Sequence, residues 1–291
     1  MFWRNKINLQ LYQNTTSLFQ SDIWGEFANN VPGLKRHKLN DFIIVEYGNL
    51  IYTTGITKNQ LEDLNLLIDL AKFVKGINTL NKQIFIDFQI LENDIIVKQI
   101  SDIMNKYGFV TTRTYLTPRQ RAIVDLSFDL KEIKDNYKSK TFNDITRAKK
   151  NGVKVVEDWD INQFYKLYLQ TSDRHRFSPQ PFEYFDSLIN VLKQTGNGKL
   201  LFAGKEEYSC TAIIAEYNNI LYYLYAGSND KLNYLNASSV LQDYIIELAK
   251  KSGYNFYDLM GVRSDLNYGP TKFKLKFATA ILKLVNAFTE Q

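Results

Sequence analysis

Three lysines alternate with apolar residues in the segment NYGPTKFKLKFATA, residues 267–280 of the 291-residue chain. The alternating residues are Lys272, Phe273, Lys274, Leu275, Lys276 and Phe277. Successive side chains of a strand point to opposite faces, so this spacing predicts an amphipathic strand whose lysines meet water. A second interpretation is that at least one of the lysines faces a cleft and a negatively charged ligand.

A basic stretch, YKSKTFNDITRAKKNGVKV (137–155), carries Lys140, Arg147 and Lys150 among its cations and has Asp144 as its single acid before Lys154. Its apolar residues recur at helical spacing, which predicts a helix with one cationic side. Such a face is most often only solvated. The alternative is that it binds the phosphates of a nucleic acid or of a nucleotide-linked substrate.

Two further stretches combine polar groups with rigid or aromatic surroundings. TSDRHRFSPQPFEYF (171–185) contains Arg174, His175, Ser178 and Tyr184, and its two prolines end the preceding helix and fix a loop. A plain helix terminus with cations near its carbonyl end explains the same spacing. ILYYLYAGSND (220–230) predicts a strand that carries Tyr223 and Tyr225 on one face.

The composition excludes several classes of function. With one cysteine and two histidines, a structural zinc site or a Cys/His nucleophile pair is not expected. No P-loop sequence is present. A net charge of +5 permits an anionic partner without requiring one. No apolar run has the length of a signal peptide or of the ~20 residues that span a bilayer, and we therefore expect a cytoplasmic protein.

Helical and strand patterns alternate along the chain, which predicts a mixed α/β fold. Helices are expected at 61–75, 96–107, 160–174 and 237–251, and strands at 83–91, 109–116, 121–128, 199–205, 209–217 and 220–226. The length favours two domains, and we expect them at 1–150 and 151–291, with the basic stretch as the connector and a last strand able to return to the first domain.

In order along the chain, several segments resemble the FemABX family, which transfers amino acids from aminoacyl-tRNA onto peptidoglycan precursors. The matching segments are SKTFNDITRAKKNGV (139–153), RHRFSPQPFEYF (174–185), LYYLYAGS (221–228), SSVLQDYIIELAKKSGYNFYDLMGV (238–262) and Phe273-Lys274. The resemblance implies two tandem acetyltransferase-like (GNAT-like) domains, the first of them abbreviated, and no cofactor besides aminoacyl-tRNA as co-substrate. It also implies a UDP-linked or lipid-linked muramyl peptide as acceptor, with peripheral contact to the membrane surface as an option.

The resemblance also suggests roles for single residues. Lys274 matches the family's active-site lysine and, with Tyr225, is the expected catalytic group. The expected substrate-binding residues are Tyr184, Ser178, Arg174, Phe273 and Tyr223. The expected contacts to tRNA or phosphate are Lys140, Arg147, Lys150 and Lys35.

Two departures from the family pattern concern the acceptor. The region 24–55 is shorter than in the family, with Lys35 as the candidate for its phosphate-contacting lysine, and Gln180 stands where some relatives have a basic residue. Two alternatives stay open. One is an acyl-CoA N-acyltransferase on the same fold, although no glycine lies between Gly227 and Gly253 to form a pyrophosphate turn. The other is a non-catalytic RNA-binding protein.

Overall fold

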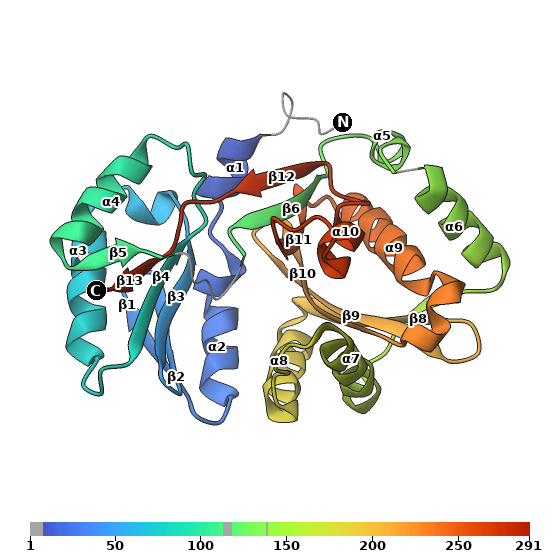
Figure 1. Cartoon of the computed structure of the whole chain (residues 1–291), viewed down its shortest axis with the longest axis horizontal. Coiled ribbons are helices and arrows are strands. Elements are labelled where there is room, and N and C mark those ends of the chain that lie inside the picture. Colours follow the sequence, from blue (N-terminus) through green and yellow to red (C-terminus); the bar gives the residue numbers. More distant parts are fainter. Residues whose placement is uncertain (1–7, 113–117, 138) are drawn as a thin grey trace. The chain divides into compact units, whose positions relative to one another are not determined.

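The chain divides into two compact units (Figure 1). The computed structural model describes residues 8–112, 118–137 and 139–291. The N-terminal unit consists of Asn8–Arg121 together with Leu282–Gln291, and the C-terminal unit contains Ala122–Ile281. We expected the boundary near residue 150, but residues 122–150 belong to the C-terminal unit, because their helices pack within its core.

The N-terminal unit is built on a sheet with strand order β1-β2-β3-β4-β13-β5. Its strands are β1 (Leu34–Leu39), β2 (Phe42–Tyr47), β3 (Leu50–Ile56), β4 (Gln83–Phe88), β5 (Phe109–Thr111) and β13 (Phe288–Glu290). Its helices are α1 (Leu9–Asn14), η1 (Leu18–Gln20), α2 (Asp22–Asn30), η2 (Asn59–Leu61), α3 (Asn65–Ile77) and α4 (Ile96–Lys106). The expected strand 109–116 is β5 only as far as Thr111, and residues 113–117 lie outside the described part.

Alternation along β2 explains why helices cover both faces of this sheet. Phe42 and Ile44 belong to the core formed with α3 and α4, whereas Ile43 and Val45 pack with Ala28 of α2. Successive residues of a strand point to opposite faces, and an apolar run such as FIIV therefore requires cover on both.

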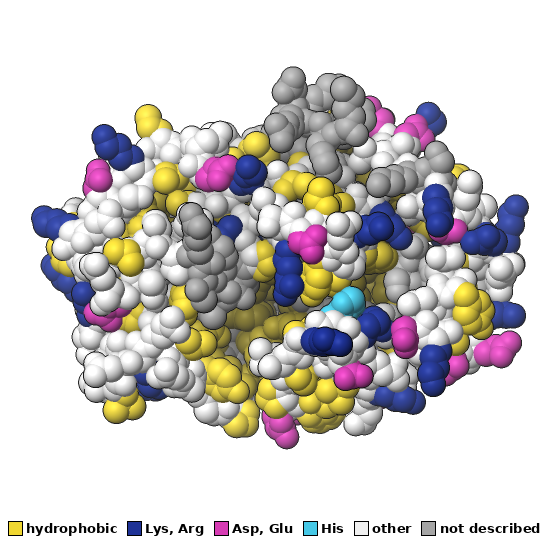
Figure 2. Space-filling model, viewed as in Figure 1, with side chains coloured by type: hydrophobic (Ala, Val, Ile, Leu, Met, Phe, Trp, Pro, Cys, Tyr) yellow, Lys and Arg dark blue, Asp and Glu magenta, His cyan; other side chains and the backbone are white. Residues whose placement is uncertain are grey.

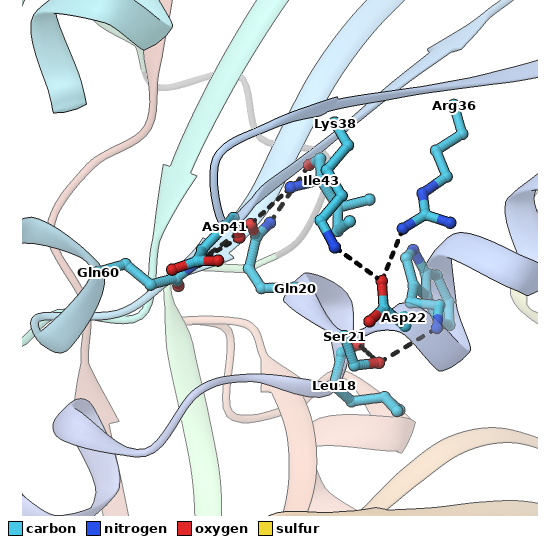
Figure 3. Close-up of polar contacts among 10 residues, drawn as sticks. Leu18, Gln20, Ser21, Asp22, Arg36, Lys38, Asp41, Ile43 and Gln60 are labelled. Atoms are coloured by element: carbon cyan, nitrogen blue, oxygen red, sulfur yellow. Dashed lines mark hydrogen bonds and ion pairs between the residues drawn. The ribbon is translucent and has the colours of Figure 1, made fainter.

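A buried glutamine links the entrance of α2 to the sheet of the same unit (Figure 3). Gln20 Oε1 accepts from Ile43 N at 3.0 Å, as drawn in Figure 3. The Nε2 of the same side chain donates to Thr54 O at 2.8 Å. Beyond it, Asp22 accepts from Arg36 and Lys38 at 2.8 and 3.1 Å, and these hydrogen bonds lower the pKa of its carboxyl group. We assign this network a structural role, because it joins η1, α2, β1 and β2.

The C-terminal unit is built on a second sheet, with strand order β12-β6-β11-β10-β9-β8-β7. The strands are β6 (Gln120–Asp125), β7 (Lys154–Glu157), β8 (Gly198–Gly204), β9 (Tyr208–Tyr217), β10 (Ile220–Ser228), β11 (Phe256–Val262) and β12 (Ala280–Lys283). The helices are α5 (Leu130–Asp135), α6 (Ser139–Lys150), α7 (Ile161–His175), α8 (Phe182–Thr195), η3 (Asp230–Leu235), α9 (Ala237–Lys251) and α10 (Gly269–Lys274). The mixed α/β class is therefore confirmed.

Helices cover both faces of this sheet as well. The helices α7 and α8 lie on one face and α9 on the other, and α6 packs outside α9 (Figure 1). At Gly227 of β10, an added Cβ would lie 2.5 Å from the backbone of Leu167, so the absence of a side chain lets α7 approach the strand closely. This close packing sets the position of the loop that follows α7.

Candidate active site

A pocket of about 740 Å³ lies within the C-terminal unit, on the side where β10 and β11 separate. Its walls come from the end of α7, the strands β9 and β10, the start of α9, and α10. The lining residues include Tyr168, Thr171, Arg174, His175, Phe177, Ser178, Gln180, Ser209, Cys210, Tyr223, Leu224, Tyr225, Asn236, Ser238, Ser239, Tyr268, Gly269, Phe273, Lys274 and Lys276.

Two neighbouring strands stop pairing near the pocket. The parallel ladder between β10 and β11 ends at Tyr222 and Asp258, and a bulge follows in β10 between Tyr223 and Tyr225. In β11, Met260 has a φ of 66°, which is rare for a side chain of this size, and its N–H donates to the Asp258 carboxylate at 2.7 Å. The bulge redirects the backbone of β10, and the residues from Tyr223 to Ser228 on that part of the strand line the pocket.

Lys274 is the last residue of a short helix, not of a strand. The alternation in 267–280 predicted a strand, and this prediction is wrong: α10 begins at Gly269 with Pro270 in its first turn, where a missing N–H costs nothing. Lys274 lines the pocket, and its Nζ donates to Gly261 O at 2.9 Å. Lys272 is exposed outside the pocket, as expected for a surface residue.

The tyrosines of β10 form one wall of the pocket. Tyr225 and Tyr223 both line it, while Tyr184 of α8 lies behind Tyr225, with 2.7 Å between the two hydroxyl oxygens. The ring of Tyr225 also packs edge-on against Phe185 at 5.0 Å. Burial raises the pKa of Tyr223 well above its usual value, so its hydroxyl stays protonated. Tyr184 is thus a support for the wall and does not line the pocket.

Arg174 and Ser178 come from the end of α7 and the loop after it. Arg174 lines the pocket, but its guanidinium is held by β10: it donates to Ser228 O at 3.1 Å and to Ser228 Oγ at 2.8 Å. It therefore ties the end of α7 to β10. Ser178 is exposed at the mouth, and the neighbouring Gln180 lines the pocket as a neutral side chain.

None of the expected phosphate-contacting residues lines this pocket. Lys140, Arg147 and Lys150 are exposed on α6, and Arg147 pairs with Asp144 at 2.8 Å. Lysine and arginine side chains gather along the α6 side of the C-terminal unit in Figure 2, mixed with a few acidic ones. Lys35 belongs to the N-terminal unit, where it is 3.8 Å from Glu46. Lys138 lies outside the described residues.

Several lining residues could not be singled out from the sequence. Lys276 was expected at the surface, but it lines the pocket and lies over the ring of Phe273, with Nζ 5.6 Å from the ring centre. Ser209 and Cys210 come from β9, which carried no chemical signal. His175 was noted only as part of a polar loop, although it is one of two histidines in the chain. The small number of histidines was the only feature of the sequence that could have drawn attention to His175.

The described residues contain no group of three or more His, Cys, Asp or Glu side chains that could hold a metal ion. Within the same residues, every helix is too short or too polar to cross a bilayer.

Comparison with known proteins agrees with this fold and extends to the sequence. The model of the FemAB family matches residues 77–204 and 203–290. An enzyme of Weissella viridescens, named UDP-N-acetylmuramoylpentapeptide-lysine N(6)-alanyltransferase, is 29% identical over 163 residues. That match covers 52% of this chain and 46% of the relative, so the chain spans about half the length of the curated relative it matches.

Two solved structures share the fold. A crystal structure of FemX superimposes with a TM-score of 0.75 at 15% identity, covering 98% of this chain and 96% of that one. A tandem GNAT protein from the clavulanic acid pathway gives a TM-score of 0.52 at 7% identity, covering 89% and 83%. The expected architecture of two tandem GNAT-like units is thus confirmed.

Proposed function

Because this chain belongs to the FemAB family, we propose that it is an aminoacyltransferase, which moves an amino acid from aminoacyl-tRNA to an amine of a peptidoglycan-precursor stem peptide. The observation that carries the proposal is Lys274: the residue that matches the family's lysine lines the same pocket as Tyr225. The Weissella relative is named for transfer to the lysine of a UDP-linked muramoyl pentapeptide, and this name supports a peptidoglycan precursor as the acceptor. We propose the cytoplasm as the place of reaction.

For this reaction the protein mainly has to position the two reactants and to stabilise the charge that develops between them. An aminoacyl ester is already activated, and its attack by an amine runs downhill. Holding both reactants in reactive geometry contributes about 7–11 kcal/mol. Lys274 would stabilise the negative charge that develops on the carbonyl oxygen or hold the terminal tRNA phosphate. Its bond to Gly261 O fixes the direction of the ammonium group before substrate arrives.

The remaining lining residues would bind the acceptor. Tyr225 and Tyr223 offer aromatic faces and hydroxyls, Phe273 an apolar contact and Ser178 a hydrogen bond at the mouth. Arg174 supports the wall through Ser228, and Tyr184 supports Tyr225. Gln180 brings no charge, which favours recognition of the acceptor through its peptide over its phosphates.

The test follows radiolabelled amino acid from a charged total tRNA pool to UDP-linked and lipid-linked muramyl pentapeptides. We expect label on one of these acceptors and a loss of about 10²–10³-fold in rate for Lys274→Ala, the usual cost of removing one charge-stabilising donor. Lys272→Ala is the matched control, because it removes the same charge two residues away outside the pocket. Wild-type protein that labels neither acceptor overturns the proposal.

A second candidate rests on the start of α9. Asn236, Ser238 and Ser239 line the pocket, and the N-terminus of a 15-residue helix is a favourable place for a phosphate. An acyl-CoA N-acyltransferase would use it in this way. Retention of the protein on CoA resin, with acyl transfer from CoA to an amine, would favour this candidate over aminoacyl-tRNA.

A further inference from the structure

Amide formation in this pocket requires a proton acceptor, and few of the side chains that line the pocket can act as one. An attacking amine becomes positively charged and must lose a proton before the amide is complete. No Asp or Glu occurs among the described lining residues. Cys210 is fully buried, and burial raises the pKa of its thiol to about 12. Among the described lining residues, His175 is therefore the side chain whose usual pKa, about 6.5, suits a base near neutral pH.

The position of His175 is set by the end of α7 and the start of α10. Arg176 adopts the left-handed conformation, with φ of 53°, and ends α7 directly after the histidine. The imidazole packs edge-on against Tyr268, with 5.9 Å between ring centres. A Cβ added to Gly269 would lie 3.3 Å from its Cε1, so the glycine leaves room for the ring. His175 thus lies against the first residue of the helix that ends in Lys274.

The surroundings keep this imidazole neutral. Burial lowers the pKa of His175, and the positive charges of Arg174 and Arg263 lower it further. Arg263 itself lies over the ring of Tyr268, with its guanidinium carbon 4.0 Å from the ring centre, and Lys274 and Lys276 add positive charge to the same pocket. No described residue forms a hydrogen bond with either ring nitrogen of His175, so a lone pair is available to a substrate.

We propose that His175 is the general base of the transfer reaction, an inference that rests on the proposed function. The acceptor amine attacks the ester carbonyl carbon and forms the C–N bond while His175 takes one N–H proton. The C–O bond to the terminal ribose then breaks, and the imidazolium returns that proton to the leaving ribose oxygen. Atoms and charges balance without any further reactant.

The experiment compares wild type, His175→Asn and His175→Gln in the transfer assay across pH 5–9. In the wild type, log kcat/KM rises with a slope of two below the imidazole pKa, because both the amine and His175 must lose a proton, and with a slope of one above it. The variants keep the amine's slope of one throughout and lose about 10²-fold in rate at neutral pH, the lower end of what a general base contributes. Imidazole added to His175→Ala restores part of the rate.

The chain supplies its own control. His37, the other histidine, lies on β1 of the N-terminal unit and bonds to Glu46 at 3.0 Å, so His37→Asn keeps the wild-type profile. In an NMR titration of wild type, the resonance that disappears in His175→Asn has a pKa below about 6.5. If the wild type transfers the amino acid and both His175 variants still show the wild-type slope of two at low pH, the inference about His175 is overturned and the proposed function stands. Absence of transfer by the wild type overturns the proposed function and this inference with it.

Discussion

The hydroxyl oxygens of Tyr184 and Tyr225 lie 2.7 Å apart, although one residue supports the pocket wall and the other faces the pocket. Tyr184 is 8% exposed on α8, and Tyr225 belongs to the bulged part of β10. This hydrogen bond holds the bulge against α8. It therefore couples the stability of the fold to the geometry of the wall.

Removing either hydroxyl should cost similar amounts of stability. We expect Tyr184→Phe and Tyr225→Phe each to lower the free energy of unfolding by about 0.5–1.5 kcal/mol, because each leaves its partner without this bond. The double variant should cost clearly less than the sum of the two, since both single variants lose the same hydrogen bond. Denaturant unfolding measures all three, and strictly additive costs would contradict the coupling. In the transfer assay, Tyr225→Phe should raise the KM for the acceptor more than Tyr184→Phe does.

The cations of α6 provide a test of tRNA binding. We expect the triple variant Lys140→Ala, Arg147→Ala, Lys150→Ala to bind tRNA more weakly and to reduce the slope of log K against log salt by about one for each phosphate that these side chains neutralise. Binding is measured by filter retention at 50–200 mM salt. The control is the triple variant Lys72→Ala, Lys98→Ala, Lys106→Ala, which removes the same number of positive charges from exposed positions of the N-terminal unit. Equal slopes for the two variants would show that α6 is only solvated.

The stability that the Asp94 carboxylate adds to the fold should be lost in acid. Burial alone would raise the pKa of this carboxyl group, but hydrogen bonds from Ile96 N, Lys58 and Gln13 outweigh it, and the net pKa is lowered. A lowered folded-state pKa stabilises the fold above the unfolded value of about 3.9, and this stability is lost as the pH falls through the folded value.

We therefore expect Asp94→Asn to cost about 1.5–3 kcal/mol near pH 7, in the range of hydrogen bonds to charged groups, and the cost to shrink below about pH 4. Denaturant unfolding between pH 3 and 7 gives the comparison, with Asp102→Asn, exposed on α4, as the control. A cost that is the same at both ends of the range would refute the assignment.

Phe288 should be among the most costly side chains to remove from the N-terminal unit. It is fully buried, contacts Phe88 with 5.9 Å between ring centres, and belongs to β13 between β4 and β5. Phe288→Ala is expected to destabilise this unit by about 3–5 kcal/mol, the usual cost of a large cavity. Thr289→Ala, half-buried on the same strand, should cost about 1 kcal/mol or less, because it leaves no such cavity. Thermal unfolding of both variants checks the difference.

The spacing of apolar residues was enough to locate the long helices and strands. It failed for short elements, whose structure depends on tertiary contacts. The expected strand 209–217 and helix 237–251 coincide with β9 and α9, because each has a long amphipathic or buried pattern. The segment 267–280 was misassigned because α10 has only six residues and Pro270 favours a helix start that alternation hides.

The pocket itself could be predicted only through the family resemblance. Lys274, Tyr225 and Ser178 were named from matched segments and line one pocket. Lys276 and His175 were not assigned to it, because their place depends on where β10 and β11 stop pairing and on the close approach at Gly269. Neither feature leaves a local pattern in the sequence.

The place of β13 in the sheet bears on the order in which the two units form. Residues 122–281 are continuous, so every strand from β7 to β11 is available as soon as that stretch has been synthesised. The N-terminal unit must wait for residues 288–290, although most of it leaves the ribosome first, because β13 supplies the pairing partner of both β4 and β5. The unit made first is thus the one completed last, and a fragment ending at Arg121 would expose an unpaired edge of β4.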